Sequence, residues 1–440
     1  MNAKVVKDVL INQILALSPK DYSSNPGRDF SRNRKLPFHR MLSIILDMNG
    51  GSLSNELMDH FHFDPEGATS SAFIQQRAKI LPEVFRDLLL NFNDEMETLQ
   101  SSETFHEMRL FAADGSDIQI PVNPEDEDSF YPGANGQHPY NMIHLNALYD
   151  LLSNTYVDAI IQKNHNMNER QALIDMVENS PFGSALVIAD RGYESYNCMA
   201  HIQEAGWYYL IRIKDKRGIA RGLELPASEE FDLNVSLNLT RRMTNEVKEL
   251  IKDKNRYRYI PNNVNFDYLP PLDGHHHVDT VFYNIPFRIV RIRISDDTLE
   301  TLVTNLPASS FTSEDLKHLY ALRWGIETSF RSLKYFVGML QFHAKNTRFV
   351  IQEVYASLVV FNFVAWIILQ IPILKKSCEY SYKINFAAAT HICKRFLREK
   401  IHPPDMEKLI TKYVSPIRPN RTHPRDHAIR SAINFTYRIA

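Results

Sequence analysis

Cysteine is scarce in this sequence of 440 residues: only Cys198, Cys378 and Cys393 occur, and no two of them are close in the chain. A disulfide framework needs several paired cysteines, and a zinc knuckle needs cysteines a few residues apart. The sequence therefore predicts neither feature. A reducing cytoplasm fits this composition, and we expect the protein to work there.

Net charge is also nearly absent, because 50 lysines and arginines stand against 52 aspartates and glutamates and give a formal charge of −2. This balance gives no bulk signal for a nucleic-acid partner. Any DNA-binding surface must come from local clusters of lysine and arginine. Such clusters occur in the segment 27–40 and after Ser415, where a solvated linker and a frayed end are the alternative interpretations.

No segment has the pattern of a leader peptide or a clear membrane span. Residues 1–18 lack the uninterrupted apolar core and the cleavage site of a signal peptide, and they predict an amphipathic helix. The run 349–374 is apolar and long, but Glu353 and Asn362 interrupt it and Pro372 shortens it. We interpret it as a buried helix and expect no membrane partner.

The length and a hydrophobic content of 44% allow more than one core, so we expect several domains in one polypeptide. Hydrophobic periodicity changes along the chain and divides it into five parts. They are a helical region at 1–100, an α/β core at 101–215, a β-rich insertion at 216–305, a second part of the core at 306–370, and a helical, basic region at 371–440.

The α/β pattern is clearest between Met108 and Lys214. It predicts three strands, a helix, a strand, a helix and a last strand. The fourth strand, SALVIAD, is apolar and ends at Asp190. Because ligands of open α/β sheets bind at strand ends, Asp190 is a candidate site residue.

A long helix is predicted over residues 312–338. Thr312 and Asp315 have the spacing of a capping box, and Gly338 is a suitable stop. At about 100° per residue, one polar stripe gathers a single carboxylate among cations and a phenol. Its members are Tyr320, Arg323, Glu327, Arg331 and Lys334. An exposed face with i,i+4 ion pairs is the alternative interpretation.

The spacing Tyr320-x2-Arg323-x3-Glu327-x6-Lys334 matches the YREK signature of bacterial DDE transposases of insertion-sequence family four. Two further motifs resemble that family. VIADRGYES, with Asp190, is similar to its second aspartate motif, and FAADGS, with Asp114, is similar to its first. The resemblance covers most of the chain from 109 to 361.

The resemblance implies a ribonuclease-H-like core interrupted by a β insertion. It also implies that Asp114, Asp190 and Glu327 are the catalytic acids and hold Mg²⁺ or Mn²⁺, two ions per site. Hard oxygen ligands suit these ions, which can activate an oxygen nucleophile and stabilise a leaving group. Asp117 competes with Asp114 for the first position, because it lies only three residues further on.

Several residues are expected to contact DNA. The resemblance implies that Arg323 and Lys334 bind phosphates and that Tyr320 positions the backbone; Arg191, beside Asp190, joins them. Arg77 lies in the second of two helices, at 70–92, which could enter a DNA groove; an ordinary helical hairpin is the alternative. The run His275–His277 could suggest a metal site, but three consecutive histidines alone supply no folded ligand geometry. We therefore interpret the run as a solvated loop.

The implied activity is cut-and-paste transposition: hydrolysis at the ends of an insertion sequence and strand transfer into target DNA. The implied partners are double-stranded DNA with terminal inverted repeats, target DNA and a second subunit in a synaptic complex, in the bacterial cytoplasm and on the nucleoid. A nuclease that cuts without joining and a domesticated DNA-binding protein are the alternatives.

One departure from the family concerns base stacking. Relatives that form a DNA hairpin can stack a flipped base on a tryptophan in the insertion, whereas Trp207, Trp324 and Trp366 all lie outside its interior. Aromatic residues that could replace it are Phe266, Tyr268, Phe282 and Tyr283.

Overall fold

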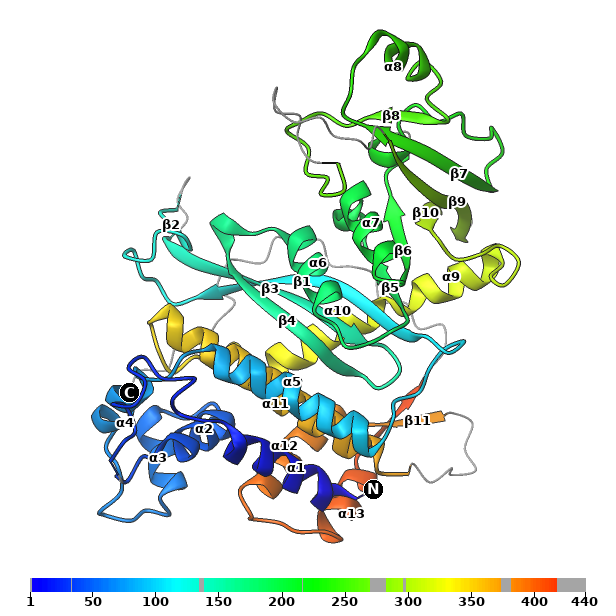
Figure 1. Cartoon of the computed structure of the whole chain (residues 1–440). Helices are drawn as coiled ribbons and strands as arrows, with labels where there is room; N and C mark the ends of the chain where they lie inside the picture. The colour runs from blue at the N-terminus through cyan, green and yellow to red at the C-terminus, as the bar shows by residue number, and fades with distance from the viewer. Residues whose placement is uncertain are drawn as a thin grey trace.

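The computed structural model describes residues 2–32, 34–133, 138–215, 217–269, 282–295, 298–372 and 381–417. Cys378, the run His275–His277 and the arginines after Ile417 lie outside these residues. The described chain has a mixed α/β fold built on one large sheet, with helices on both faces (Figure 1).

The large sheet has ten strands of mixed direction. They are β1 (Arg109–Ile120), β2 (Phe130–Tyr131), β3 (Tyr140–Asp150), β4 (Thr155–Lys163), β5 (Ala185–Ala189), β6 (Tyr208–Ile213), β7 (Phe231–Thr240), β8 (Tyr257–Tyr259), β9 (Tyr283–Ser295) and β10 (Thr298–Thr304). A separate two-stranded sheet pairs β11 (Ser381–Ile384) with β12 (Val414–Ile417).

Thirteen α-helices occur in the described residues. They are α1 (Ala3–Ala16), α2 (Phe38–Asp47), α3 (Leu53–His60), α4 (Ser70–Arg77), α5 (Glu83–Leu99), α6 (Glu169–Glu178), α7 (Tyr196–Glu204), α8 (Asn245–Leu250), α9 (Ser313–Leu322), α10 (Trp324–Ser332), α11 (Thr347–Leu369), α12 (Phe386–Leu397) and α13 (Asp405–Lys412).

The order of the first strands in space is β4, β3, β1, β5, β6. β3 runs antiparallel to β1 and β4, whereas β1, β5 and β6 are parallel to one another. In the register of β1 and β5, Ala113 lies opposite Ala189. An aspartate follows each of these alanines, so Asp114 on β1 and Asp190 directly after β5 lie at about the same level of the sheet.

The strands of the expected insertion at 216–305 do not form a sheet of their own. β10 pairs directly with β6, and β9, β7 and β8 follow outward in that order. The segment therefore extends the central sheet beyond β6, toward the top of the view in Figure 1.

The two faces of the sheet pack against different helices. Ala112 of β1 belongs to a core shared with α5, α10 and α11, whereas Phe111 and Ala113 belong to a core shared with α6 and α7. Side chains alternate along a strand. Asp114 is therefore on the α10 side, and Gly115 and Asp117 are on the α6 side.

Helix α11 is the long apolar element beneath the sheet. It is long and apolar enough to cross a membrane, but 83% of its most apolar window is buried within the protein. The prediction of a buried helix is thus confirmed. Its polar residues have partners: the Asn362 side chain accepts a hydrogen bond from the Tyr156 backbone N–H and donates to Asn93 Oδ1, both at 2.8 Å.

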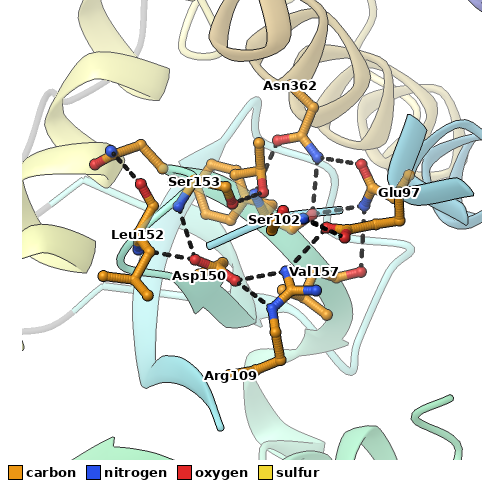
Figure 2. Close-up of polar contacts among 12 residues, drawn as sticks. Glu97, Ser102, Arg109, Asp150, Leu152, Ser153, Val157 and Asn362 are labelled. Carbon is orange, nitrogen blue, oxygen red and sulfur yellow. Dashed lines mark hydrogen bonds and ion pairs between the residues drawn. The ribbon is translucent and has the colours of Figure 1, made fainter. Parts of the chain in front are cut away.

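The start of β1 is fixed by a buried ion-pair network (Figure 2). Arg109 Nη2 lies 2.6 Å from Asp150 Oδ2 and 2.9 Å from Glu97 Oε1, which joins β1 to the end of β3 and to α5. The other oxygen of Asp150 accepts hydrogen bonds of 2.8 Å from the N–H groups of Leu152 and Ser153. This network secures the strand on which Asp114 lies.

Candidate active site

Glu327 lies on a helix that is less regular than the sequence predicts. The capping box of Thr312 and Asp315 is confirmed, and Gly338 ends the segment with a left-handed φ of 96°. The expectation of one continuous helix is wrong, because α9 and α10 are separated at Arg323. A π-helical turn, η4 (Leu333–Val337), then follows α10.

Gly325 lies two residues after this break, within α10. Glycine weakens a helix, and a Cβ at this position would lie 2.7 Å from Leu151 Cδ2, so the leucine side chain would have to move. The helix therefore passes directly against the turn between β3 and β4. This close packing sets where the following turn, with Glu327, meets the sheet.

Asp114 and Asp190 are both held by backbone N–H groups. Asp114 Oδ1 accepts a hydrogen bond of 2.9 Å from Gly115 N–H, and Asp190 Oδ1 accepts one of 2.6 Å from Gly192 N–H. Asp190 is the N-cap of a short 3-10 turn, η2 (Arg191–Tyr193). The second oxygen of Asp114, Oδ2, lies toward Arg323.

Arg323 connects the third acid to the first. Its Nη2 donates a hydrogen bond of 2.8 Å to Glu327 Oε1, and its Nη1 lies 3.9 Å from Asp114 Oδ2. The Arg323 side chain is only 7% exposed, so the guanidinium charge is directed at the two acids.

The three acids influence one another electrostatically. The pKa of Asp114 is raised to about 6, chiefly by burial and further by the negative charges of Asp190 and Glu327. The N–H of Gly115 and the charge of Arg323 oppose this rise. Asp190 and Glu327 are therefore both near enough to Asp114 to disfavour its negative charge, and Arg323 only partly relieves this repulsion.

The donor set suits a divalent cation, because three clustered carboxylates offer hard oxygen ligands and excess negative charge. In the described part of the chain, however, no three acidic, histidine or cysteine side chains are arranged closely enough to hold an ion as they lie. The Arg323 guanidinium instead occupies the space between Asp114 and Glu327. Metal binding would require these side chains to turn toward a common point.

Asp114 and Asp117 have different surroundings. Asp117 lies on the α6 side of β1, where its Oδ1 is 2.7 Å from His144 Nδ1 and accepts a hydrogen bond from Asn164. The bond with His144 lowers the pKa of Asp117. Arg323 and the other two acids surround Asp114 instead, so the geometry favours Asp114 as the first acid.

The predicted DNA contacts fall into two groups. Arg191 is exposed, and Lys334 is partly exposed. Tyr320 and Arg323 are each only 5% exposed, and Arg323 Cζ lies 5.6 Å from the centre of the Tyr320 ring. In this conformation Tyr320 therefore supports Arg323 and has almost no surface with which to contact DNA.

The prediction that Arg77 contacts DNA is wrong for this conformation. The sequence predicts one helix over 70–92, but the chain breaks between α4 and α5, where Pro82 removes a backbone N–H donor. Arg77, at the end of α4, is 2% exposed. Its three guanidinium nitrogens bond to Gln352 Oε1, Glu353 Oε1 and the Phe349 carbonyl, so it links α4 to α11 and is not available to DNA.

The aromatic residues considered for base stacking mostly pack on one another. Phe266 is 1% exposed, and its ring lies 5.3 Å from that of Tyr283, whose hydroxyl donates to Glu204. Phe266 is therefore excluded as a stacking surface, and Tyr283 is engaged within the protein.

Two residues near the acids, His144 and Glu169, belong to no motif identified in the sequence. His144 on β3 and Glu169 at the first position of α6 are 3.1 Å apart, between Nε2 and Oε1. Glu169 lies in the first turn of a helix that follows a strand, which is the one hint that its side chain could reach the strand ends.

Comparison with known proteins finds similarity to a family, to a curated protein and to solved structures. Residues 105–363 match the family described as "Transposase DDE domain". The chain is 24% identical over 344 residues to the transposase for insertion sequence element IS231B of Bacillus thuringiensis subsp. berliner, covering 71% of this chain and 68% of that protein.

The third match is a solved structure, the cryo-EM structure of the piggyBac transposase synaptic complex with hairpin DNA. The match covers 96% of this chain and 87% of that chain, with 9% sequence identity and a TM-score of 0.43. This likeness is too low to support a conclusion about the fold or the function.

Proposed function

The chain belongs to the transposase DDE domain family, and from that premise we propose that it catalyses cut-and-paste transposition of an insertion sequence. The reaction has two parts: hydrolysis of phosphodiester bonds at the ends of the element and transfer of the freed 3′-hydroxyl ends into target DNA. One observation carries the proposal. Asp114 and Asp190 lie at about the same level of the sheet, at the ends of the paired segments of the parallel strands β1 and β5. Arg323 connects Glu327 to Asp114.

The proposed site uses Asp114, Asp190 and Glu327 to hold Mg²⁺ or Mn²⁺, two ions per site. When bound, such ions supply a deprotonated oxygen nucleophile and stabilise the charge on the leaving oxygen. Arg323 keeps Glu327 turned toward the aspartates. Lys334 places a positive charge beside β1, where it can neutralise a phosphate.

A finer classification follows from two observations. The spatial order β4, β3, β1, β5, β6, with only β3 reversed, supports a ribonuclease-H-like core. The spacing of Tyr320, Arg323, Glu327 and Lys334 supports membership of insertion-sequence family four. We propose both, with α1–α5 as the region that binds the DNA end.

The proposed partners are double-stranded DNA with terminal inverted repeats, target DNA and a second copy of the chain in a synaptic complex. Arg191 and Lys334 offer positive charge next to the acids. The proposed location is the bacterial cytoplasm, on the nucleoid when DNA is bound.

The test is a cleavage and joining assay with the DNA that flanks the gene. Purified protein, Mg²⁺ and a labelled fragment with the inverted repeat should give both a cut end and a product joined to plasmid DNA. Glu327→Gln and Asp190→Asn should bind the repeat and neither cut nor join. Cutting without joined product would indicate a nuclease, and binding without cutting by the wild type would indicate a DNA-binding protein that has lost its chemistry.

A further inference from the structure

The glycines that follow Asp114 and Asp190, Gly115 and Gly192, both lie close to the side chain of Glu169. A Cβ on Gly115 would collide with His144 Nε2 and would lie 2.6 Å from Glu169 Oε1. A Cβ on Gly192 would lie 2.9 Å from Asp190 Oδ1 and 3.4 Å from Glu169 Oε2. One carboxylate, Glu169, thus reaches both aspartate segments with its two oxygens.

Glu169 is held in this place by a buried histidine. The His144 side chain is 5% exposed and lies between two carboxylates, with Nδ1 2.7 Å from Asp117 Oδ1 and Nε2 3.1 Å from Glu169 Oε1. Burial alone would lower the pKa of His144, but the hydrogen bond with Asp117 and the negative charges of Asp117 and Glu169 raise it to about 9. At neutral pH the imidazolium therefore bridges β1, β3 and α6 as a cation.

The first turn of α6 also holds the second aspartate segment by another contact. Arg170 Nε donates a hydrogen bond of 2.9 Å to the Gly192 carbonyl. Beneath this turn lies the buried Tyr193, whose pKa is raised by burial and then by the negative charges of Glu169, Asp114 and Asp190.

We propose that Glu169 and His144 are positioning residues, which hold the segments around Gly115 and Gly192 so that Asp114 and Asp190 face one metal-bearing site at a fixed separation. This inference rests on the proposed function. It adds two residues that belong to none of the three transposase motifs. Residues that orient metal ligands typically change metal affinity or activity by about 10- to 100-fold when they are replaced.

The chain contains a matched control. Glu178, at the opposite end of α6, lies 2.6 Å from His201 Nδ1, and Asp267 lies 2.8 Å from His201 Nε2. This is the same arrangement of a histidine between two carboxylates, on the same helix, away from the three acids. Glu178→Gln should therefore show how much stability is lost when a contact between a histidine and a carboxylate is removed.

The experiment compares Glu169→Gln, His144→Gln and Glu178→Gln in the full-length chain. Three quantities are measured: the melting temperature, the affinity of the DNA-free protein for Mn²⁺ by electron paramagnetic resonance, and the Mg²⁺ concentration that gives half-maximal cleavage. We expect Glu169→Gln and His144→Gln to weaken Mn²⁺ binding and raise the Mg²⁺ requirement by about tenfold. Glu178→Gln should lower the melting temperature to a similar extent. It should change neither the affinity for Mn²⁺ nor the Mg²⁺ concentration that gives half-maximal cleavage.

A wild-type metal dependence in Glu169→Gln would overturn the inference, as would an equal shift in Glu178→Gln. If Glu169→Gln does not fold, Glu169→Asp keeps the charge on a shorter side chain and should show a smaller shift in the same direction; no shift would again contradict the proposal. If the wild type neither binds Mn²⁺ nor cuts DNA, the proposed function fails, which is distinct from a failure confined to the variants.

Discussion

Lys334 donates a hydrogen bond of 2.7 Å from Nζ to the hydroxyl of Ser116, two residues after Asp114 on the same face of β1. It also donates one of 3.0 Å to the Asp117 carbonyl. Burial lowers the pKa of Lys334. The π-helical turn that carries Lys334 is thus tied to the strand of the first acid, and a cation is kept beside the site.

Lys334→Met should lower the rate of DNA cleavage by at least about tenfold, because a preorganised cation near the reacting phosphate is lost. The melting temperature should change little. The control is Lys317→Met on α9, because Lys317 lies 3.8 Å from Glu314 and makes only a weak surface pair. Equal cleavage rates in the two variants would remove Lys334 from the site.

Asp114→Asn should abolish cleavage, whereas Asp117→Asn should remain substantially active. The reason is that Asp114 faces Arg323 and Glu327, and Asp117 faces His144 on the other side of the strand. Rates of Mg²⁺-dependent cutting at saturating DNA provide the measurement. The reverse result would move the first acid three residues along the chain.

Asp114→Asn and Asp117→Asn should have opposite effects on the stability of the metal-free protein. The folded pKa of Asp114 is about 6 and its unfolded pKa is about 3.9, so charging it disfavours folding, and stability falls as pH rises through that window. Asp114→Asn should therefore stabilise the protein at pH 7 by on the order of 2–3 kcal/mol and have no such effect below about pH 4. Urea unfolding in a chelator at pH 4 and pH 7 measures the difference.

Asp117→Asn should destabilise the protein at pH 7, because the bond with His144 lowers the folded pKa of Asp117. Charged Asp117 stabilises the folded protein fully at a pH above its unfolded pKa. This stabilisation is lost as the pH falls through the lower pKa of the folded state. A stabilising effect of Asp117→Asn at pH 7 in the same urea experiment would contradict the role assigned to this carboxylate.

Local patterns predicted the parts of this structure that depend on neighbours in the chain. The capping box at Thr312, the stop at Gly338 and the buried helix around Asn362 follow from short-range rules and are confirmed. The helix breaks were missed, although Pro82 and Gly325 stand in the sequence at or near them. The apolar pattern continues across both Pro82 and Gly325, and such a pattern predicts an uninterrupted helix.

Contacts between distant segments could not be predicted in this way. The ion pair of Arg77 with Glu353 joins residues 276 positions apart, and nothing near Arg77 distinguishes a buried guanidinium from a DNA contact. The pairing of β10 with β6 and the meeting of His144 with Glu169 depend on tertiary packing in the same way. A single sequence carries no record of such pairs.

Arg77→Met should destabilise the fold by about 3–5 kcal/mol, because it leaves Glu353 buried without its cation. Adding Glu353→Gln should restore part of the loss, since the uncompensated charge is removed. Chemical unfolding of the wild type and the three variants measures the coupling. A stable Arg77→Met protein with weakened DNA binding would show instead that Arg77 is a DNA contact.

Binding to the inverted repeat should be strongly salt-dependent, because each neutralised phosphate releases counterions. A chain with a net charge of −2 must bind through local basic groups, and two copies with two DNA ends should form the cleaving species. Titration of protein against one labelled end, with complexes resolved by mass and assayed for cutting, tests this. Efficient cleavage by a complex of one protein and one end would contradict it.

The pairing of β1 with β5 determines which changes of chain length the site can survive. Asp114 faces α10 only because an unbroken alternation runs from Arg109 to that position. Deletion of one residue within this stretch turns the carboxylate to the α6 side and puts Gly115 in its place. Deletion of two residues keeps the face but shifts the carboxylate by roughly 6–7 Å along the strand. A change of chain length by even one codon in this stretch therefore separates the two aspartates.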